Sequence, residues 1–64
     1  MPKRYSSAEL IKIIVADGWV EVRVKGSHHH FKHPKKTGIV TIAHPKKIEK
    51  PGTANNILRQ AGLK

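Results

Sequence analysis

The chain has 64 residues, no cysteine and a formal net charge of +9, with 13 lysines and arginines against four acidic residues. The lack of cysteine excludes disulfides, thiolate metal sites and a cysteine nucleophile. No apolar run approaches the roughly 18 residues that a membrane span needs, and no signal-peptide pattern opens the chain. We therefore expect one soluble, cytoplasmic domain over residues 1–64 with no membrane contact.

The positive charge is clustered in the middle of the chain. One acid, Glu49, stands among eight cations between residues 23 and 50, namely Arg23, Lys25, Lys32, Lys35, Lys36, Lys46, Lys47 and Lys50. Such a cluster suits a polyanion whose condensed counterions are released on binding, so it indicates nucleic acid as a partner. A face that docks an acidic protein and a solvated basic surface are the alternatives.

The first predicted element is a helix from about Ser7 to Asp17. Ser6 and Glu9 have the spacing of a capping box, in which each side chain accepts a hydrogen bond from the other residue's backbone N–H. Gly18 is a natural stop for this helix. The apolar residues of its buried face are Leu10, Ile11, Ile14 and Val15.

Three strands are predicted next, because the apolar period changes to two. Val20, Val22 and Val24 alternate with Trp19, Glu21 and Arg23. A turn at residues 25–27 leads to a strand from His28 to His33, and a second turn at residues 34–38 leads to a strand from Ile39 to Ala43. The middle strand carries Phe31, His29 and His33 on one face and His28, His30 and Lys32 on the other.

A basic loop from His44 to Lys50 and a second helix complete the predicted fold. Pro51 suits the first helical position, and Gly62 ends the helix. Its inner stripe is Ile57, Leu58 and Ala61. The order α-β-β-β-α predicts an α+β fold, a three-stranded antiparallel sheet with both helices on one face. The sheet residues expected beneath the helices are Val20, Val22, Val24, Phe31, Val40 and Ile42. The opposite face should stay open and carry the function.

Several segments of the chain resemble the HicA toxin family. They are residues 24–34 with the run Gly26-Ser27-His28, residues 40–47, the closing helix over residues 52–63, and the first helix ending at Gly18-Trp19. The resemblance covers about residues 6–63. It implies a fold like that of double-stranded-RNA-binding domains, endoribonuclease activity on messenger RNA, and inhibition by a HicB-type antitoxin. It also implies that the functional histidine follows Gly-Ser directly, which is His28 here.

His28 and His30 are the candidate catalytic residues. RNA carries its own nucleophile, the 2′-hydroxyl, so cleavage needs a base, an acid and positive charge near the phosphate. Histidine suits the base, because its ordinary pKa of about 6.5 lies close to working pH. Two same-face histidines roughly 6.5–7 Å apart could flank one phosphate, with His28 as base and His30 or His44 as acid. The candidate RNA-binding residues are Lys25, Lys32, Lys46 and Lys47.

The histidines also allow less specific interpretations. Two same-face histidines could bind zinc, but a stable site needs three or four ligands, and Glu21 on the neighbouring strand is the only candidate carboxylate. We therefore expect neither a metal nor a small-molecule cofactor. His29 and His33 share the face of Phe31 and should be partly buried. Trp19 and Phe31 should pack in the core, although aromatic rings also stack on bases.

Two other functions fit parts of the sequence. A non-catalytic double-stranded-RNA-binding module explains the charge and the fold, but such modules carry lysines at the start of the last helix, whereas residues 51–56 are uncharged here. A protein-interaction adaptor that binds an acidic partner explains the charge alone. RNA integrity after incubation distinguishes the enzyme from the first alternative, and RNA affinity distinguishes it from the second.

Overall fold

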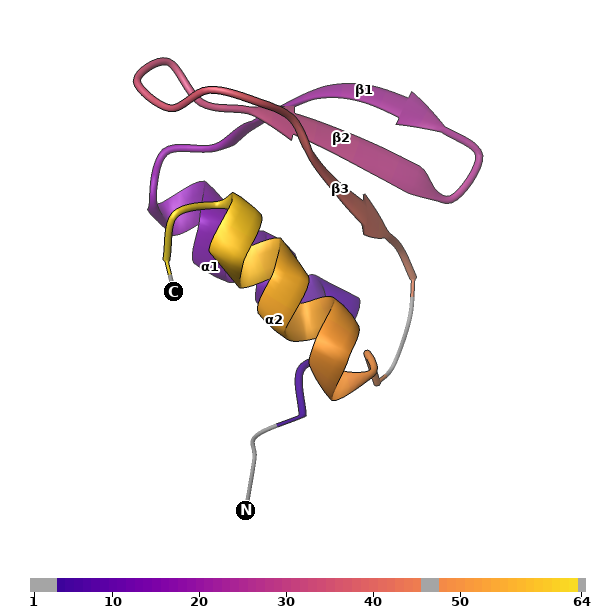
Figure 1. Ribbon diagram of the computed structural model, residues 1–64. Coiled ribbons are helices and arrows are strands. Elements are labelled where there is room, and N and C mark those ends of the chain that lie inside the picture. Colours follow the sequence, from indigo (N-terminus) through magenta and orange to yellow (C-terminus); the bar gives the residue numbers. More distant parts are fainter. Residues whose placement is uncertain (1–3, 46–47, 64) are drawn as a thin grey trace.

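The computed structural model describes residues 4–45 and 48–63. In chain order the elements are α1 (Ser7–Ala16), β1 (Val20–Lys25), β2 (His28–Lys32), β3 (Val40–Ala43) and α2 (Pro51–Gln60) (Figure 1). The predicted order α-β-β-β-α and the α+β class are confirmed, and the observed bounds differ from the predicted ones by a residue or two. Within the described part of the chain, neither helix is long and apolar enough to cross a membrane.

Local sequence signals set the starts of both helices. The Ser6 hydroxyl accepts a hydrogen bond from the Glu9 backbone N–H at 3.1 Å, and the Glu9 carboxylate accepts one from the Ser6 N–H at 3.1 Å. This is the predicted capping box, which satisfies two backbone donors that the helix itself leaves free. Pro51 is the first residue of α2, where its missing N–H costs no hydrogen bond.

The sheet is antiparallel with the strand order β1-β2-β3. Gly26 and Ser27 form the two-residue turn between β1 and β2. Gly26 has a φ of 59°, and no described residue other than glycine has a positive φ. A positive φ at the first central residue alone is the pattern of a type II′ turn, which matches the twist of a hairpin. This turn makes His28 the first residue of β2.

Both helices cover the same face of the sheet (Figure 1). They contact β3 at one side of the sheet, while β1 forms the other side and lies away from them. The buried core joins the helices to β2, β3 and the residue before β1, and its members are Leu10, Ile14, Trp19, Phe31, Val40, Ile42, Ala54, Ile57, Leu58 and Ala61. Trp19 and Phe31 are packing residues, as expected, since each exposes only 1% of its surface.

The prediction that Val20, Val22 and Val24 pack beneath the helices is wrong. They expose 58%, 53% and 50% of their surface. Two structural features explain the difference. The first is the position of β1, which is an edge strand beyond the reach of the helices, so even a helix-facing side chain such as Val24 stays half exposed.

The second feature is a β-bulge in β1. The register shifts between Glu21 and Arg23, so that Glu21 pairs with Phe31 while Arg23 pairs with His30. One extra residue, Val22, therefore stands at the shift and breaks the simple alternation on which the prediction relied. Glu21 faces the helix side, together with Phe31, whereas Arg23 faces the open side.

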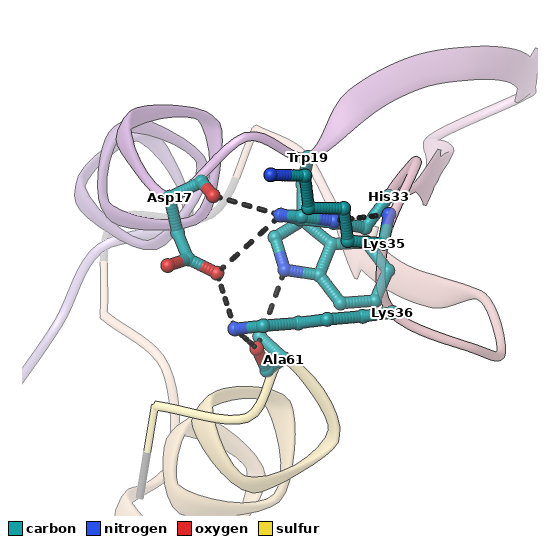
Figure 2. Close-up of polar contacts among 6 residues, drawn as sticks. All are labelled: Asp17, Trp19, His33, Lys35, Lys36 and Ala61. Atoms are coloured by element: carbon teal, nitrogen blue, oxygen red, sulfur yellow. Dashed lines mark hydrogen bonds and ion pairs between the residues drawn. The ribbon is translucent and has the colours of Figure 1, made fainter.

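The long β2–β3 connection is tied to the C-terminal ends of both helices (Figure 2). The Lys36 ammonium donates to the Asp17 carboxylate at 2.6 Å and to the Ala61 carbonyl at 2.9 Å. The Trp19 indole N–H donates to the same carbonyl at 3.3 Å. The hydrogen bond from Lys36 holds the pKa of Asp17 below its usual value. These contacts couple the loop, α1 and α2 around the buried indole.

His33 belongs to the same group of contacts (Figure 2). Its Nδ1 accepts a hydrogen bond from the Lys35 backbone N–H at 2.9 Å, so its Nε2 carries the proton and donates to the Asp17 carbonyl at 2.8 Å. Both ring nitrogens are thus used by the backbone, and the ring meets Trp19 edge to face. His33 is half-buried, as predicted, and has a structural role in the loop.

Candidate functional site

The face of the sheet that the helices leave uncovered is called the open face. Directly paired residues of an antiparallel sheet share a face, so the register assigns its members. Along β2 they are His28, His30 and Lys32; along β1 they are Lys25, Arg23 and Val20; along β3 they are Ala43 and Thr41. The structure therefore brings both candidate catalytic histidines onto one surface with Lys25 and Lys32. Lys46 and Lys47, the other two predicted RNA-binding residues, lie outside the described residues.

His28 is the most accessible histidine of the open face. It is exposed, it directly follows the Gly26–Ser27 turn, and its cross-strand neighbours are Lys25 and Ala43. Among the described residues, none makes a hydrogen bond or ion pair with its imidazole. Both ring nitrogens of His28 are therefore left for hydrogen bonds with a bound molecule.

His30 lies two residues further along β2 on the same face. Its Nδ1 is hydrogen-bonded to the Thr41 hydroxyl at 2.9 Å across the β2–β3 pair. The ring is half-buried, and within the described part of the chain its Nε2 has no partner. His30 is thus oriented by Thr41 and keeps one nitrogen for a ligand.

His29 and His44 lie on the helix side. His29 pairs with buried Ile42, and its Nδ1 is 2.5 Å from the Glu21 carboxylate. The ring of His44 meets that of His29 edge to face at 5.4 Å, and its Nδ1 is 2.7 Å from the Ser7 hydroxyl. His44, the alternative candidate for the acid, is therefore directed toward α1 and away from the surface that carries His28.

Negative charge is excluded from the open face. The chain has four acidic residues, and none of them lies on the open face. Glu9 caps α1, and Asp17 binds Lys36. Glu21 contacts His29 on the helix side, and Glu49 is buried. The open face consequently presents cations without a neighbouring carboxylate among the described residues. A surface of this kind attracts phosphates and raises the local concentration of a polyanion.

Arg23 is a residue of this surface that the sequence reasoning did not single out. Together with His30 and Lys32 it lines a hollow whose apolar part is formed by Val22 and Ile39. The β-bulge creates this arrangement, because it leaves Val22 beside Arg23 at the level of His30. The predicted alternation placed Val22 beneath the helices and so could not reveal this hollow, since a bulge shifts the face of every residue on one side of it.

The histidine triplet does not assemble a ligand set for a metal. His28 and His30 face one side of the sheet and His29 the other. Among the described residues, no three histidine, aspartate or glutamate side chains come together in a way that could hold a metal ion.

Comparison with known proteins identifies the family. The model of the HicA toxin of bacterial toxin–antitoxin systems matches residues 7–63. The chain belongs to the HicA toxin family. A solved structure described as a toxin–antitoxin complex from Streptococcus pneumoniae contains a chain that is 32% identical, with a TM-score of 0.76 over 91% of the present chain and 97% of that chain. No curated protein matches the chain.

The structure places the run Gly26-Ser27-His28, one of the segments that resemble the HicA family, at one end of the open face. Gly26 and Ser27 make the tight turn, and His28 is the first residue to leave it. A histidine at this position is held by backbone pairing on both sides while its imidazole stays in solvent. The turn and the strand pairing therefore fix the position of the His28 imidazole without hydrogen bonds to its ring nitrogens.

Proposed function

We propose that this HicA-family chain is the toxin of a type II toxin–antitoxin pair and that it cleaves messenger RNA without a metal ion, which inhibits translation. The observation that carries the proposal is the position of His28, an exposed imidazole on a face that presents cations and, among the described residues, no acid. Family membership and the likeness to a chain of a toxin–antitoxin complex support the toxin role.

His28 is the proposed general base. It removes the proton of the RNA 2′-hydroxyl, and the 2′-oxygen attacks the adjacent phosphorus. The bond between phosphorus and the 5′-oxygen breaks, and the leaving oxygen takes a proton from an acid. The products are a 2′,3′-cyclic phosphate and a 5′-hydroxyl. Lys25 and Lys32 stabilise the charge on the phosphates on either side of the reacting one.

His30 is the proposed acid. It shares the open face with His28, and residues two apart on a strand stand roughly 6.5–7 Å from each other. Because Thr41 binds Nδ1 of His30, Nε2 is the atom that faces a substrate. The alternative acid, His44, is directed to the helix side by Ser7.

The proposed partner is an antitoxin of the HicB type that covers the open face with an acidic surface. The same cations that attract RNA phosphates would then attract the antitoxin, so RNA and antitoxin should compete. The competition is measured by adding antitoxin to toxin bound to a labelled RNA oligomer. A ternary complex with RNA still held on the open face would show that inhibition does not act by masking.

Cleavage assays with two neighbouring histidine variants test the nuclease. The wild-type chain should cut RNA in excess EDTA and leave 2′,3′-cyclic phosphate ends. His28→Ala should lower the rate by a factor of about 10²–10⁴, the usual contribution of a general base. The matched control is His29→Ala, which removes an imidazole from the helix side and should leave cleavage by the folded protein unchanged.

Three results would contradict the proposal. Full activity of a folded His28→Ala protein would refute the catalytic role of that residue. Loss of activity in EDTA, restored by one divalent metal ion, would establish a metal-dependent reaction. RNA that is bound but never cut would make the chain a non-catalytic RNA-binding module.

A further inference from the structure

The hollow on the open face combines apolar and cationic side chains. Its lining residues are Val22, Arg23, His30, Lys32 and Ile39, and its volume is about 380 Å³. Val22 and Ile39 expose 53% and 52% of their surface, so they contribute little to the core. Small-molecule sites occupy roughly 300–1,000 Å³, and the hollow is at the lower end of that range, which is suitable for one nucleotide-sized group.

We propose that this hollow is a nucleobase-binding subsite, which holds one unstacked base of single-stranded RNA beside the phosphate presented to His28. This inference rests on the proposed function, because it names where the substrate of that site is recognised. A nucleotide has an apolar, planar base attached to an anionic phosphate. The hollow offers the complementary pair, an apolar surface from Val22 and Ile39 and cations from Arg23 and Lys32.

The cations of the hollow suit the edge and the face of a base. The Lys32 ammonium can donate to an acceptor on the base edge, and Nε2 of His30 remains for the leaving oxygen of the proposed reaction, since Nδ1 is held by the Thr41 hydroxyl at 2.9 Å. A guanidinium such as that of Arg23 stacks on a base plane as well as pairing with phosphate. Single-stranded RNA is recognised through such splayed-out bases, whereas duplex RNA hides its bases from side chains.

The position of the hollow relates it to the proposed reaction. His30 lines the hollow and is the next residue after His28 on the same face of β2. A base held against Val22 and Ile39 would therefore fix the adjacent stretch of backbone along the strand toward His28. Positioning of this kind selects which phosphate is cut.

Charge argues against a second copy of this chain as the occupant of the hollow. A second copy of this chain would place like charges opposite each other, because no acidic residue faces the open side among the described residues. A protein partner normally buries about 800 Å² on each side, an area much larger than five side chains provide, so the hollow alone does not require one.

The test is a binding measurement that does not depend on cleavage. The first probe is a fluorescent hexanucleotide with 2′-O-methyl groups throughout, so it lacks the 2′-hydroxyl nucleophile and cannot be cut. The other probes are abasic versions of it, in each of which one base has been removed. With the wild-type chain, removal of one particular base should weaken binding about tenfold, the size of one base contact. The double variant Val22→Ala/Ile39→Ala should bind the intact probe as weakly as the wild type binds that abasic probe. The double variant should bind the abasic probe with the same affinity as the wild type does.

Controls keep the result interpretable. Val15→Ala is the matched variant, since Val15 is equally exposed, at 49%, but lies on α1. It should bind every probe as the wild type does. Circular dichroism checks each fold, and Ile39→Ala alone, outside the strands, repeats the measurement if the double variant does not fold.

The outcomes separate this inference from the proposed function. An abasic penalty of the same size in the wild type and in the double variant, or no penalty at any position, would overturn the subsite. Loss of antitoxin binding with unchanged RNA binding would also overturn it, because the hollow would then serve a protein. Failure of the wild-type chain to cut unmodified RNA would refute the nuclease and leave a confirmed base contact standing.

Discussion

The two faces of the three-stranded sheet place the neighbouring residues His28 and His29 in different surroundings. His29, on the helix side, has its Nδ1 against the Glu21 carboxylate and its ring against His44. His28, the preceding residue, points to the open face and has no hydrogen-bond partner among the described residues. The comparison shows that one residue along a strand separates a structural imidazole from an available one, because alternate side chains face opposite sides.

The cations divide in the same way. Lys36 lies against the C-terminal ends of the helices, where it binds both the Asp17 carboxylate and the Ala61 carbonyl. Lys25 and Lys32 are exposed on the open face, and no acid of the described chain faces them. Helix-side polar groups therefore contribute to stability, and open-face groups are free to bind a ligand.

Trp19→Ala should give the largest effect, as a loss of stability on the helix side. Trp19 is 1% exposed, and removal of a buried tryptophan side chain costs about 3–5 kcal/mol. A domain of this size has about 3–10 kcal/mol of stability in total, so much of the protein should unfold. Urea unfolding followed by circular dichroism measures the change.

The neighbouring variant Val20→Ala is its control. Val20 is 58% exposed, and its truncation should change the free energy of unfolding by less than about 0.5 kcal/mol. Equal losses for the two variants would contradict the assignment of Trp19 to the core and of Val20 to the open face.

Charge reversal on the open face should give the next largest effect, on binding and not on stability. Lys25→Glu and Lys32→Glu should each weaken RNA and antitoxin together, about tenfold or more at low salt, because both ligands are expected to use the same cations. Each lost phosphate contact should also lower the slope of log K against log salt by about 0.7 for single-stranded RNA. Lys12→Glu, on the exposed side of α1, is the control and should have little effect on either ligand.

Acid should weaken the helix-side contacts through Asp17. The hydrogen bond from Lys36 lowers the pKa of Asp17 in the folded chain below its unfolded value near 3.8. The stabilisation is therefore fully present above that unfolded pKa, and it is lost as pH falls through the lower, folded pKa. The wild type should have a larger free energy of unfolding than Lys36→Met, and this difference should become smaller below about pH 4. The part of the difference that comes from the hydrogen bond between Lys36 and Ala61 should persist.

Urea titrations at a series of pH values measure this difference. Lys35→Met is the matched control, because the Lys35 side chain is exposed and only its backbone N–H contacts His33. A difference between the wild type and Lys36→Met that stays constant from pH 7 to pH 2 would show that Asp17 contributes nothing.

Local signals in the sequence predicted the elements well, and they predicted β1 poorly. The capping box, Pro51 and the Gly26–Ser27 turn act within a few residues, so the helix starts and the hairpin could be read directly from the chain. Alternation also separated His28 and His30 from His29, because the extra residue of the bulge lies in β1 and the side chains of β2 keep their alternation. The bulge at Val22 and the position of β1 beyond the helices depend on packing between distant segments, and no local pattern encodes them.

Thr41→Val should give the smallest effect, and it tests whether the open face depends on the orientation of His30. The substitution keeps the shape of an exposed side chain and removes the hydroxyl that binds Nδ1 of His30 at 2.9 Å. Stability should change by less than about 0.5 kcal/mol. Without this bond the imidazole gains rotational freedom. The cleavage rate should fall about two- to fivefold, since a neutral hydrogen bond to an exposed group lies in the lower half of the usual range of roughly 0.5–1.5 kcal/mol. Thr41→Ser restores the hydroxyl and should restore the rate, and nitrogen chemical shifts of the His30 ring should show the same loss and recovery of a fixed tautomer. An unchanged rate in Thr41→Val, with the tautomer signal lost, would mean that the orientation of His30 does not matter to the reaction and that His28 acts with a different acid.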